Sequence, residues 1–222
     1  MSYSWRFLGL VGVFVTTLVV SNIVAVKLVE VSSRVFDAGN ILFPLAYLIG
    51  DVLTEVYGFR AARRVIWLGF ACNLLAVGAI QVAIQLPAAG FWTENQEAYE
   101  TVLGTTWRLF LASLAAYLVG EFANSMVLAR LKVATRGRFL WSRTISSTIV
   151  GQGLDSTIFV AIAFAGSGAP LAETILTTWV IKVAWETAAT PLTYAFVNWL
   201  KRHEGIDVFD VRTSFNPLAL RG

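Results

Sequence analysis

The sequence predicts an all-α integral membrane protein, a bundle of six transmembrane helices with both termini in the cytoplasm. Three observations support this fold class. Hydrophobic residues make up 57% of the 222 residues and charged residues only 14%, whereas a soluble domain carries about 25% charged residues. Six apolar segments approach the roughly 20 residues that a helix needs to cross the hydrocarbon core. The basic residues gather between these segments, where they orient a membrane protein.

The six apolar segments run approximately over residues 5–27, 40–57, 61–85, 105–131, 144–165 and 172–200. The first is too long for the apolar core of a signal peptide, which has about 7–15 residues, so we expect it to remain as a helix. The second is short and contains Pro44 near its start, which predicts a tilted or broken helix. Between them, residues 28–39 alternate enough for a short strand or a re-entrant turn. Residues 1–204 are expected to form one transmembrane domain, followed by a cytoplasmic tail, 205–222.

Loop charge orients the predicted bundle. Basic residues gather at 60–64, 130–143 and 201–212, whereas the connection 87–104 carries three glutamates and no cation. Because positively charged loops stay in the cytoplasm, we expect these basic regions and both termini inside. The chain is therefore predicted to be a multi-pass protein of the cell (inner) membrane. The net charge is +3, but the basic clusters lie beside apolar segments and are explained as orientation signals. Nucleic-acid binding is therefore not expected.

Charged side chains inside the apolar segments are the most informative feature of the sequence. A charge at the bilayer centre costs roughly 2.5–3.5 kcal/mol on insertion scales, and such residues face the interior of a bundle. Positions three and four apart share one face of a helix, so the polar residues of a segment form a narrow stripe. Lipid does not accept these stripes, and we expect them to converge on an enclosed polar site. The four longest stripes contain Tyr47, Asp51 and Glu55; Tyr117, Glu121, Asn124 and Ser125; Thr148, Gln152, Asp155 and Ser156; and Thr178, Lys182, Glu186 and Thr190.

The stripes and two further asparagines supply the candidate binding residues. Glu121 and Asp155 are the strongest candidates, because neither has a cation within reach on its own helix. Lys182 and Glu186, four residues apart, could instead neutralise each other. For the asparagines, a hydrogen bond between neighbouring helices is as good an interpretation as ligand contact. The full set of binding candidates is Glu121, Asn124, Gln152, Asp155, Lys182, Glu186, Asn22 and Asn73.

A second group of charged residues, Asp51, Glu55 and Arg63, suggests gating or coupling rather than binding. Glu55 lies near the cytoplasmic end of its segment, one turn from Arg60, so we expect it to be an ion-pair partner or a latch. The sequence has one cysteine and one histidine, far apart. We therefore expect no metal site and no cofactor.

Motifs in all six segments resemble one family of membrane proteins. They include the run from Phe43 to Phe59, FPLAYLIGDVLTEVYGF, followed by Ala62-Arg63-Arg64. Further matches are Ser21-Asn22-Ile23, Gly120-Glu121-Phe122-Ala123-Asn124-Ser125, Gly151-Gln152-Gly153-Leu154-Asp155-Ser156, and Lys182, Glu186 and Pro191. On these residues the sequence strongly resembles the queuosine precursor transporter family, over roughly residues 15 to 204.

The resemblance implies import of 7-deazaguanine bases, such as 7-cyano-7-deazaguanine and its aminomethyl relative, for salvage into the tRNA nucleoside queuosine. The family is similar to the vitamin-uptake subunits of energy-coupling-factor systems, which also have six helices and carry an Ala-x-x-x-Ala docking motif on the first. Here the first segment has only Ala25, which favours a stand-alone, proton-sensitive secondary transporter. The expected partners are a small nucleobase and the lipid bilayer, and the sequence leaves a homo-oligomer open.

Two other functions compete with this interpretation. One is a substrate-binding subunit that needs ATPase partners. The other is an intramembrane aspartyl protease with Asp51 and Asp155 as its carboxylate dyad. The stretch from Gly151 to Asp155 approximates the Gly-x-Gly-Asp pattern of such proteases, but it is one residue too long and no Pro-Ala-Leu motif occurs. Buried carboxylates in helix bundles more often mark transport paths, so an enzyme is not expected.

Overall fold

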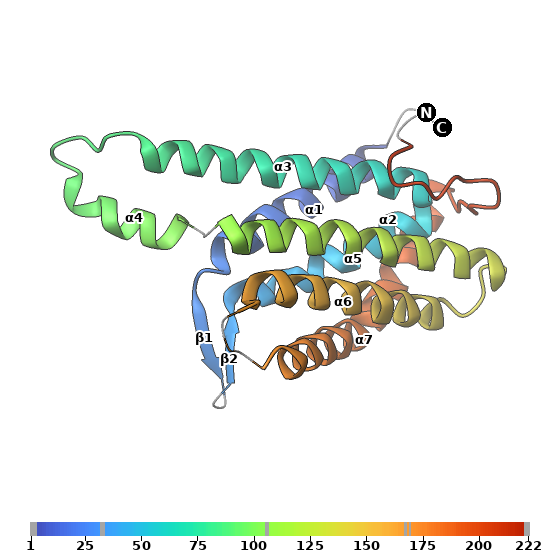
Figure 1. Ribbon diagram of the computed structural model, residues 1–222. Helices are drawn as coiled ribbons and strands as arrows, with labels where there is room; N and C mark the ends of the chain where they lie inside the picture. The colour runs from blue at the N-terminus through green and yellow to red at the C-terminus, as the bar shows by residue number, and fades with distance from the viewer. Residues whose placement is uncertain (1–3, 32–33, 105–106, 167, 169, 220–222) are drawn as a thin grey trace.

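The computed structural model describes residues 4–31, 34–104, 107–166, 168 and 170–219. Six long helices run roughly along one direction, and one short hairpin and one short helix lie at the same end of the bundle (Figure 1). The elements are α1 (Trp5–Val24), β1 (Leu28–Val31), β2 (Arg34–Asp37), the 3-10 helix η1 (Ala38–Ile41), α2 (Phe43–Tyr57), α3 (Phe59–Gln85), the 3-10 helix η2 (Thr93–Asn95), α4 (Gln96–Leu103), α5 (Trp107–Ala134), α6 (Leu140–Phe164) and α7 (Leu171–Glu204). The predicted all-α class and six long helices are confirmed.

The helices alternate in direction and give the bundle two distinct ends (Figure 1). We call the end on the left of Figure 1, with the β1–β2 hairpin, α4 and the α6–α7 connection, the hairpin end. The opposite end, with the α2–α3 turn, the α5–α6 connection and residues 205–219, is the tail end. An ion pair of 3.3 Å between Arg6 and Glu204 joins the start of α1 to the end of α7 there. Both ends of the described chain therefore lie at the tail end of the bundle.

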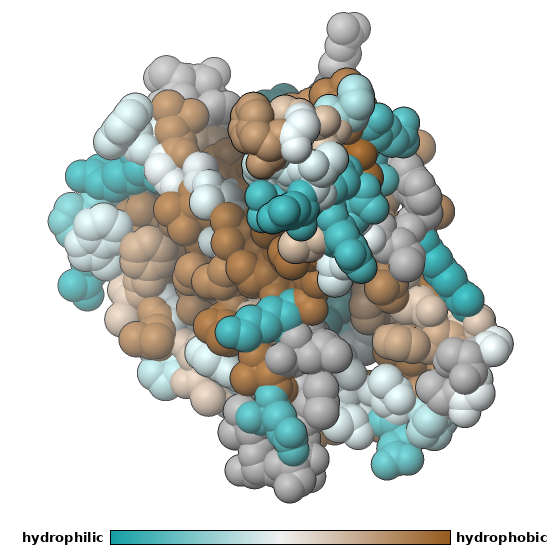
Figure 2. All heavy atoms as spheres, turned by 90° about the vertical axis from the view of Figure 1, so that its left-hand side faces the viewer, coloured by the Kyte–Doolittle hydropathy of each residue, from teal (hydrophilic) through white to brown (hydrophobic). Residues whose placement is uncertain are grey.

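Among the described residues, four stretches are long and apolar enough to cross a membrane: Trp5–Val24, Phe59–Gln85, Thr93–Ala134, which contains α5, and Leu140–Phe164. Helix α2 has 15 residues and is about 22 Å long at 1.5 Å per residue, short of the roughly 30 Å hydrocarbon core. Helix α7 is long enough, but its polar stripe lowers its hydropathy. Large apolar side chains face outward, for example Leu75, which is 73% exposed, and the face at the hairpin end also shows apolar groups between polar ones (Figure 2). These properties are typical of a multi-pass membrane protein.

Local sequence explains how the connections differ from the expected ones. Pro44 stands in the first turn of α2, where its missing N–H costs nothing, so it begins the helix and does not break it. Gly58 adopts φ 82°, a conformation open to glycine, and lets α3 begin one residue after α2 ends. The predicted strand in residues 28–39 is confirmed as an antiparallel hairpin whose register pairs Leu28 with Asp37. Helix α4, within the connection 87–104, was not predicted.

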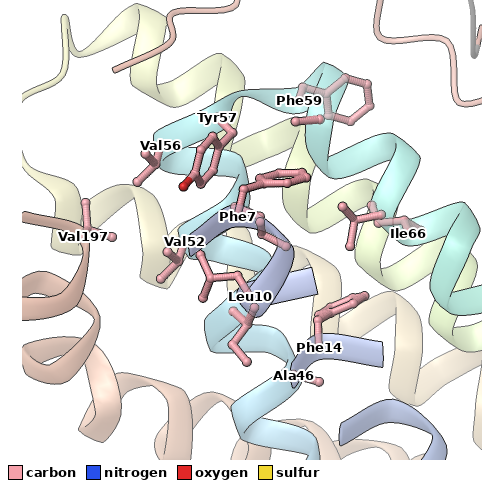
Figure 3. Packing of buried hydrophobic residues seen from close by; sticks show 14 of the residues in the cluster. Phe7, Leu10, Phe14, Ala46, Val52, Val56, Tyr57, Phe59, Ile66 and Val197 are labelled. Atoms are coloured by element: carbon pink, nitrogen blue, oxygen red, sulfur yellow. The ribbon is translucent and has the colours of Figure 1, made fainter. Parts of the chain in front are cut away.

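The apolar core is built mainly from α1, α2 and α3, and residues of α5, α6 and α7 complete it; Figure 3 shows part of it. Phe7 and Phe14 of α1 are 5% and 1% exposed. The rings of Phe7 and Tyr57 meet edge to face, with centroids 4.8 Å apart. Val197 brings α7 into the same cluster. This packing fixes one side of α2, so that its opposite, polar side faces α5 and α6.

Candidate functional site

The predicted stripes of α2, α5, α6 and α7 converge inside the bundle. We call the residues that they bring together the central cluster. Most of them are at most 8% exposed, and Lys182 is partly exposed. The cluster consists of Tyr47, Asp51, Glu121, Asn124, Thr148, Gln152, Asp155, Ser156, Lys182 and Glu186. Six of the eight predicted binding residues are thus brought together.

Small residues allow the helices to approach closely enough to form the cluster. A Cβ on Gly151 would lie 2.6 Å from the Asn124 Cβ, and one on Gly120 would lie 2.8 Å from the Asp155 Cβ. Helices α5 and α6 therefore pack with their backbones nearly in contact, as small residues permit in membranes. A Cβ on Gly50 would lie 2.1 Å from Glu121 Oε1. The carboxylate of Glu121 consequently rests on the backbone of α2.

The part of the central cluster nearest the hairpin end holds its only ion pair among the described residues. Lys182 of α7 pairs with Asp155 of α6, and the Tyr47 hydroxyl lies within hydrogen-bonding reach of the same carboxylate. The Lys182 ammonium also lies 5.9 Å from the centroid of the Phe43 ring. Asp155 has no cation on its own helix, as the sequence indicated, and receives Lys182 from α7 instead. Lys182, which could have neutralised Glu186 four residues on, makes its ion pair with Asp155. Helical spacing reports neighbours on one helix, whereas these partners come from different helices.

The deeper part of the central cluster contains polar groups with few partners. Asn124 donates to Asp51 Oδ1 at 2.7 Å, and Gln152 donates to Glu186 Oε2 at a long 3.4 Å. Seven buried side-chain atoms of the central cluster have no hydrogen-bond partner among the described residues. They are Asp51 Oδ2, Glu121 Oε1, Asn124 Oδ1, Thr148 Oγ1, Gln152 Oε1, Ser156 Oγ and Glu186 Oε1. Buried polar groups are nearly always satisfied, so such a concentration indicates a ligand site.

The electrostatics of the central cluster are unbalanced. Four carboxylates share the space with one lysine. Asp51 interacts electrostatically with Glu121 and Glu186, and Glu121 interacts with Asp155 and Glu186. Carboxylates removed from water must be neutralised, either by a bound proton or by a cation. The cluster can therefore bind protons, donor groups or positively charged groups.

Four residues of the site were not among the binding candidates, although each stands on a predicted stripe: Asp51, which was expected to act in gating or coupling, and Thr148, Ser156 and Tyr47. Thr148 and Ser156 flank Gln152 at four-residue spacing on α6, and Thr148 lies near the Glu186 carboxylate. Tyr47 stands four residues before Asp51 on α2 and is 4% exposed. Their position on the stripes was the available signal. Hydroxyl groups are common in membrane helices for other reasons, which is why the sequence does not single them out.

Asn22 and Asn73 are placed apart from the acids. Asn22 Nδ2 donates to Asn73 Oδ1 at 2.9 Å, and Ser113 Oγ donates to Asn22 Oδ1 at 3.1 Å. These bonds connect α1, α3 and α5. The geometry thus supports the alternative interpretation, in which the asparagines hold neighbouring helices together.

Glu55 belongs to a second charged cluster, which we call the tail-end charge cluster. Glu55 Oε1 accepts from Arg143 at 2.8 Å and from Lys201 at 2.7 Å, and Lys132 lies 3.7 Å away. Asp207 of the tail contacts Lys132 at 2.5 Å and Lys201 at 2.9 Å. The predicted role of Glu55 as an ion-pair partner is confirmed, with cations from α5, α6 and α7. These groups join four helices and the tail.

The tail is fixed to the bundle by further contacts. Arg63, 1% exposed, donates to the carbonyl oxygens of Ser214 and Asn216 at 3.0 and 2.9 Å. The Phe59 N–H at the start of α3 donates to Asp210 Oδ2 at 2.9 Å, and Trp67 donates to the Pro217 carbonyl oxygen at 2.9 Å. Arg63 therefore holds the tail over the tail end and does not contact the central carboxylates.

Comparisons with known proteins agree with the motifs. Residues 37–196 match the family described as "Putative vitamin uptake transporter". A "Probable queuosine precursor transporter" of Bacillus subtilis (strain 168) is 30% identical over 197 residues, which cover 86% of each chain. The "Queuosine precursor transporter" of Escherichia coli (strain K12) is 29% identical over 57% of this chain and 54% of that one. No solved structure matches. The chain therefore belongs to the family of membrane transporters that includes these queuosine precursor transporters, and not to a family of enzymes.

Proposed function

We propose that this protein imports queuosine precursors, 7-deazaguanine bases such as 7-cyano-7-deazaguanine, across the cell membrane. The names of its relatives support the substrate class. The observation that carries the proposal is the group of buried acceptor atoms without partners in the central cluster. A deazaguanine is planar and presents two adjacent N–H donors beside a carbonyl acceptor. A carboxylate complements such donors, as it does at base edges elsewhere.

Glu121 is the carboxylate that fits the donor edge of the base. Asp155, the other candidate, already pairs with Lys182 and lies beside Tyr47. Glu121 is 2% exposed and has one oxygen without a partner. The Gln152 amide, whose bond to Glu186 is 3.4 Å long, is available to donate to the carbonyl of the base. Asn124 is less available, because its amide is committed to Asp51 at 2.7 Å.

Amide variants test this assignment. Glu121→Gln keeps the size of the side chain but loses a charge-assisted bond and presents a donor to the donor edge. Calorimetry in detergent should show a loss of about 2–5 kcal/mol in binding of 7-cyano-7-deazaguanine. Asp155→Asn is measured beside it, and Glu173→Gln, at an exposed acid in the first turn of α7, is the matched control. If both central variants remain folded and bind with unchanged affinity, the site assignment is wrong.

The unbalanced charge of the central cluster supports proton-sensitive secondary transport. The first apolar segment has only Ala25 and no Ala-x-x-x-Ala docking motif, which supports transport without ATPase partners. Carboxylates that exchange a proton for a ligand can couple the two movements. Protein reconstituted alone in liposomes should accumulate or exchange the labelled base, and an imposed proton gradient should change the rate. A requirement for added ATPase subunits would instead support the substrate-binding-subunit alternative.

The orientation in the membrane is proposed with the tail end inside the cell. The arginine-rich α5–α6 connection lies at this end, and the acidic segment with α4 lies at the other (Figure 1). Single cysteines at Glu97 and Arg136, both exposed, test this in a Cys72→Ser background. An impermeant reagent should label position 97 in intact cells and miss position 136. The reverse pattern would refute the orientation.

A further inference from the structure

All seven unpartnered atoms of the central cluster can accept a hydrogen bond. Five of the seven are acceptors only: carboxylate oxygens of Asp51, Glu121 and Glu186, and amide oxygens of Asn124 and Gln152. The other two are hydroxyls, which can donate or accept. No unpartnered nitrogen donor occurs in this cluster among the described residues. The ligand that complements the site is therefore richer in donors than in acceptors.

The excess of acids over cations in the central cluster places a second requirement on the ligand, which concerns its charge. In the described part of the chain, the one lysine of the cluster pairs with Asp155, and Asp51, Glu121 and Glu186 have no ion pair. Each of the three is at most 5% exposed. A neutral base brings donors but no charge to this group of acids. A ligand that also carries a positive charge satisfies the donor requirement and reduces the repulsion among the acids.

Glu186 is the carboxylate best placed to accept that charge. Asp51 already receives a short bond from Asn124 at 2.7 Å, and Glu121 is confined against Gly50. Glu186 receives a long 3.4 Å bond from Gln152, lies near the Thr148 hydroxyl and the Lys182 charge, and keeps Oε1 without a partner. The nearby Thr148 hydroxyl can accept a further hydrogen from an ammonium group.

We propose that Glu186 binds the ammonium group of a positively charged side arm, so that the site prefers an aminomethyl-deazaguanine to the neutral cyano base. The inference rests on the proposed function, which places a deazaguanine in the central cluster. Glu121 holds the donor edge of the ring, and Glu186 binds the charged arm. Some desolvated charge pairs of this kind are net favourable in measured cases.

The test compares three bases that differ in the arm. Calorimetry in detergent measures the affinity of the wild-type protein for 7-aminomethyl-, 7-hydroxymethyl- and 7-cyano-7-deazaguanine. The hydroxymethyl base has nearly the shape of the aminomethyl base but no charge. We expect the aminomethyl base to bind at least tenfold more tightly than either neutral base. Glu186→Gln should reduce this preference to less than threefold, whereas Glu173→Gln should keep it.

Equal affinity of the wild-type protein for the three bases, or a preference for a neutral base, overturns the proposal without any variant. A preference that persists in a folded Glu186→Gln protein overturns the assignment to Glu186. Glu186→Asp, which keeps the charge, should retain part of the preference if the variant with glutamine fails to fold. If no deazaguanine binds at all, the proposed function fails, and the inference fails with it.

Discussion

The central cluster and the tail-end charge cluster are built on the same four helices, yet their acids are in opposite situations. At the tail end, Glu55 contacts three cations, and Asp207 of the tail contacts two of them. In the central cluster, three of four carboxylates have no ion pair within the described residues. Burial is not the difference, because Glu55 and Glu121 are 1% and 2% exposed. The difference lies in which partners the neighbouring helices supply.

This contrast separates structural from functional carboxylates. A buried acid paired with cations holds elements together, because removing it leaves charged neighbours without compensation. A buried acid without partners costs stability and is retained for a purpose outside the fold. The tail-end charge cluster ties α2, α5, α6 and α7 to the tail, whereas the central cluster has buried polar atoms without partners among the described residues, where we propose that the ligand binds.

The largest expected effect comes from exchanging one acid in each cluster. Glu55→Gln should lower the free energy of unfolding by about 3–5 kcal/mol, because Lys132, Arg143 and Lys201 lose their shared carboxylate. Glu121→Gln should leave the stability unchanged or raise it, because it removes a charge from a repulsive group. Unfolding in detergent measures both. Equal losses in the two variants would contradict the comparison.

A smaller effect on ligand binding is expected where α2 meets α5, at Gly50 and Glu121. Gly50→Ala places a methyl group 2.1 Å from the present position of Glu121 Oε1, so the carboxylate must move. We expect binding of the deazaguanine base to weaken at least tenfold, while overpacking costs about 1–3 kcal/mol of stability. Gly12→Ala is the control, since nothing lies within 4 Å of its Cβ position. Unchanged binding in Gly50→Ala would show that the position of Glu121 does not matter to the ligand.

The tail should contribute to stability without affecting the ligand. Asp210→Ala removes the acceptor for the first N–H of α3 and should cost about 0.5–2 kcal/mol, as the loss of a helix cap does. Affinity at the central cluster should stay the same. Arg212→Ala, at an exposed position two residues on, is the matched control for unfolding measurements. A change in ligand affinity in Asp210→Ala would show that the tail and the central cluster are coupled.

The smallest effect is a pH dependence at the tail end. Partial burial raises the pKa of Asp207, but the bonds from Lys132 and Lys201 outweigh it and hold the pKa below its ordinary value. A lowered pKa in the folded state gives stability that is present above the unfolded pKa of about 3.9 and is lost as the pH falls through the folded value. Asp207→Asn should therefore flatten the acid side of the unfolding curve below about pH 4. An unchanged acid limb would show that Asp207 contributes nothing to it.

The sequence predicted the helices and the polar stripes because both depend on local spacing. Apolar length placed six long helices, with boundaries a few residues from those observed, and four-residue spacing placed Asp51, Glu121, Gln152 and Glu186 on inward faces. The short helix α4 escaped prediction because its eight residues are too few to cross a membrane and lie in an acidic connection. Helical spacing does not reveal the class of protein, which the family motifs indicated.

The sequence by itself determined that this is a helical membrane protein with buried acids, because insertion energies and helical periodicity are properties of the chain alone. Only the tertiary structure decided which acids are paired. Asp155 and Glu121 had equal standing in the sequence, and the fold brought Lys182 to one of them and the backbone of Gly50 to the other. Glu55 likewise acquired its three cations from other helices. Ion pairs between helices depend on crossing geometry, which spacing along one helix does not encode.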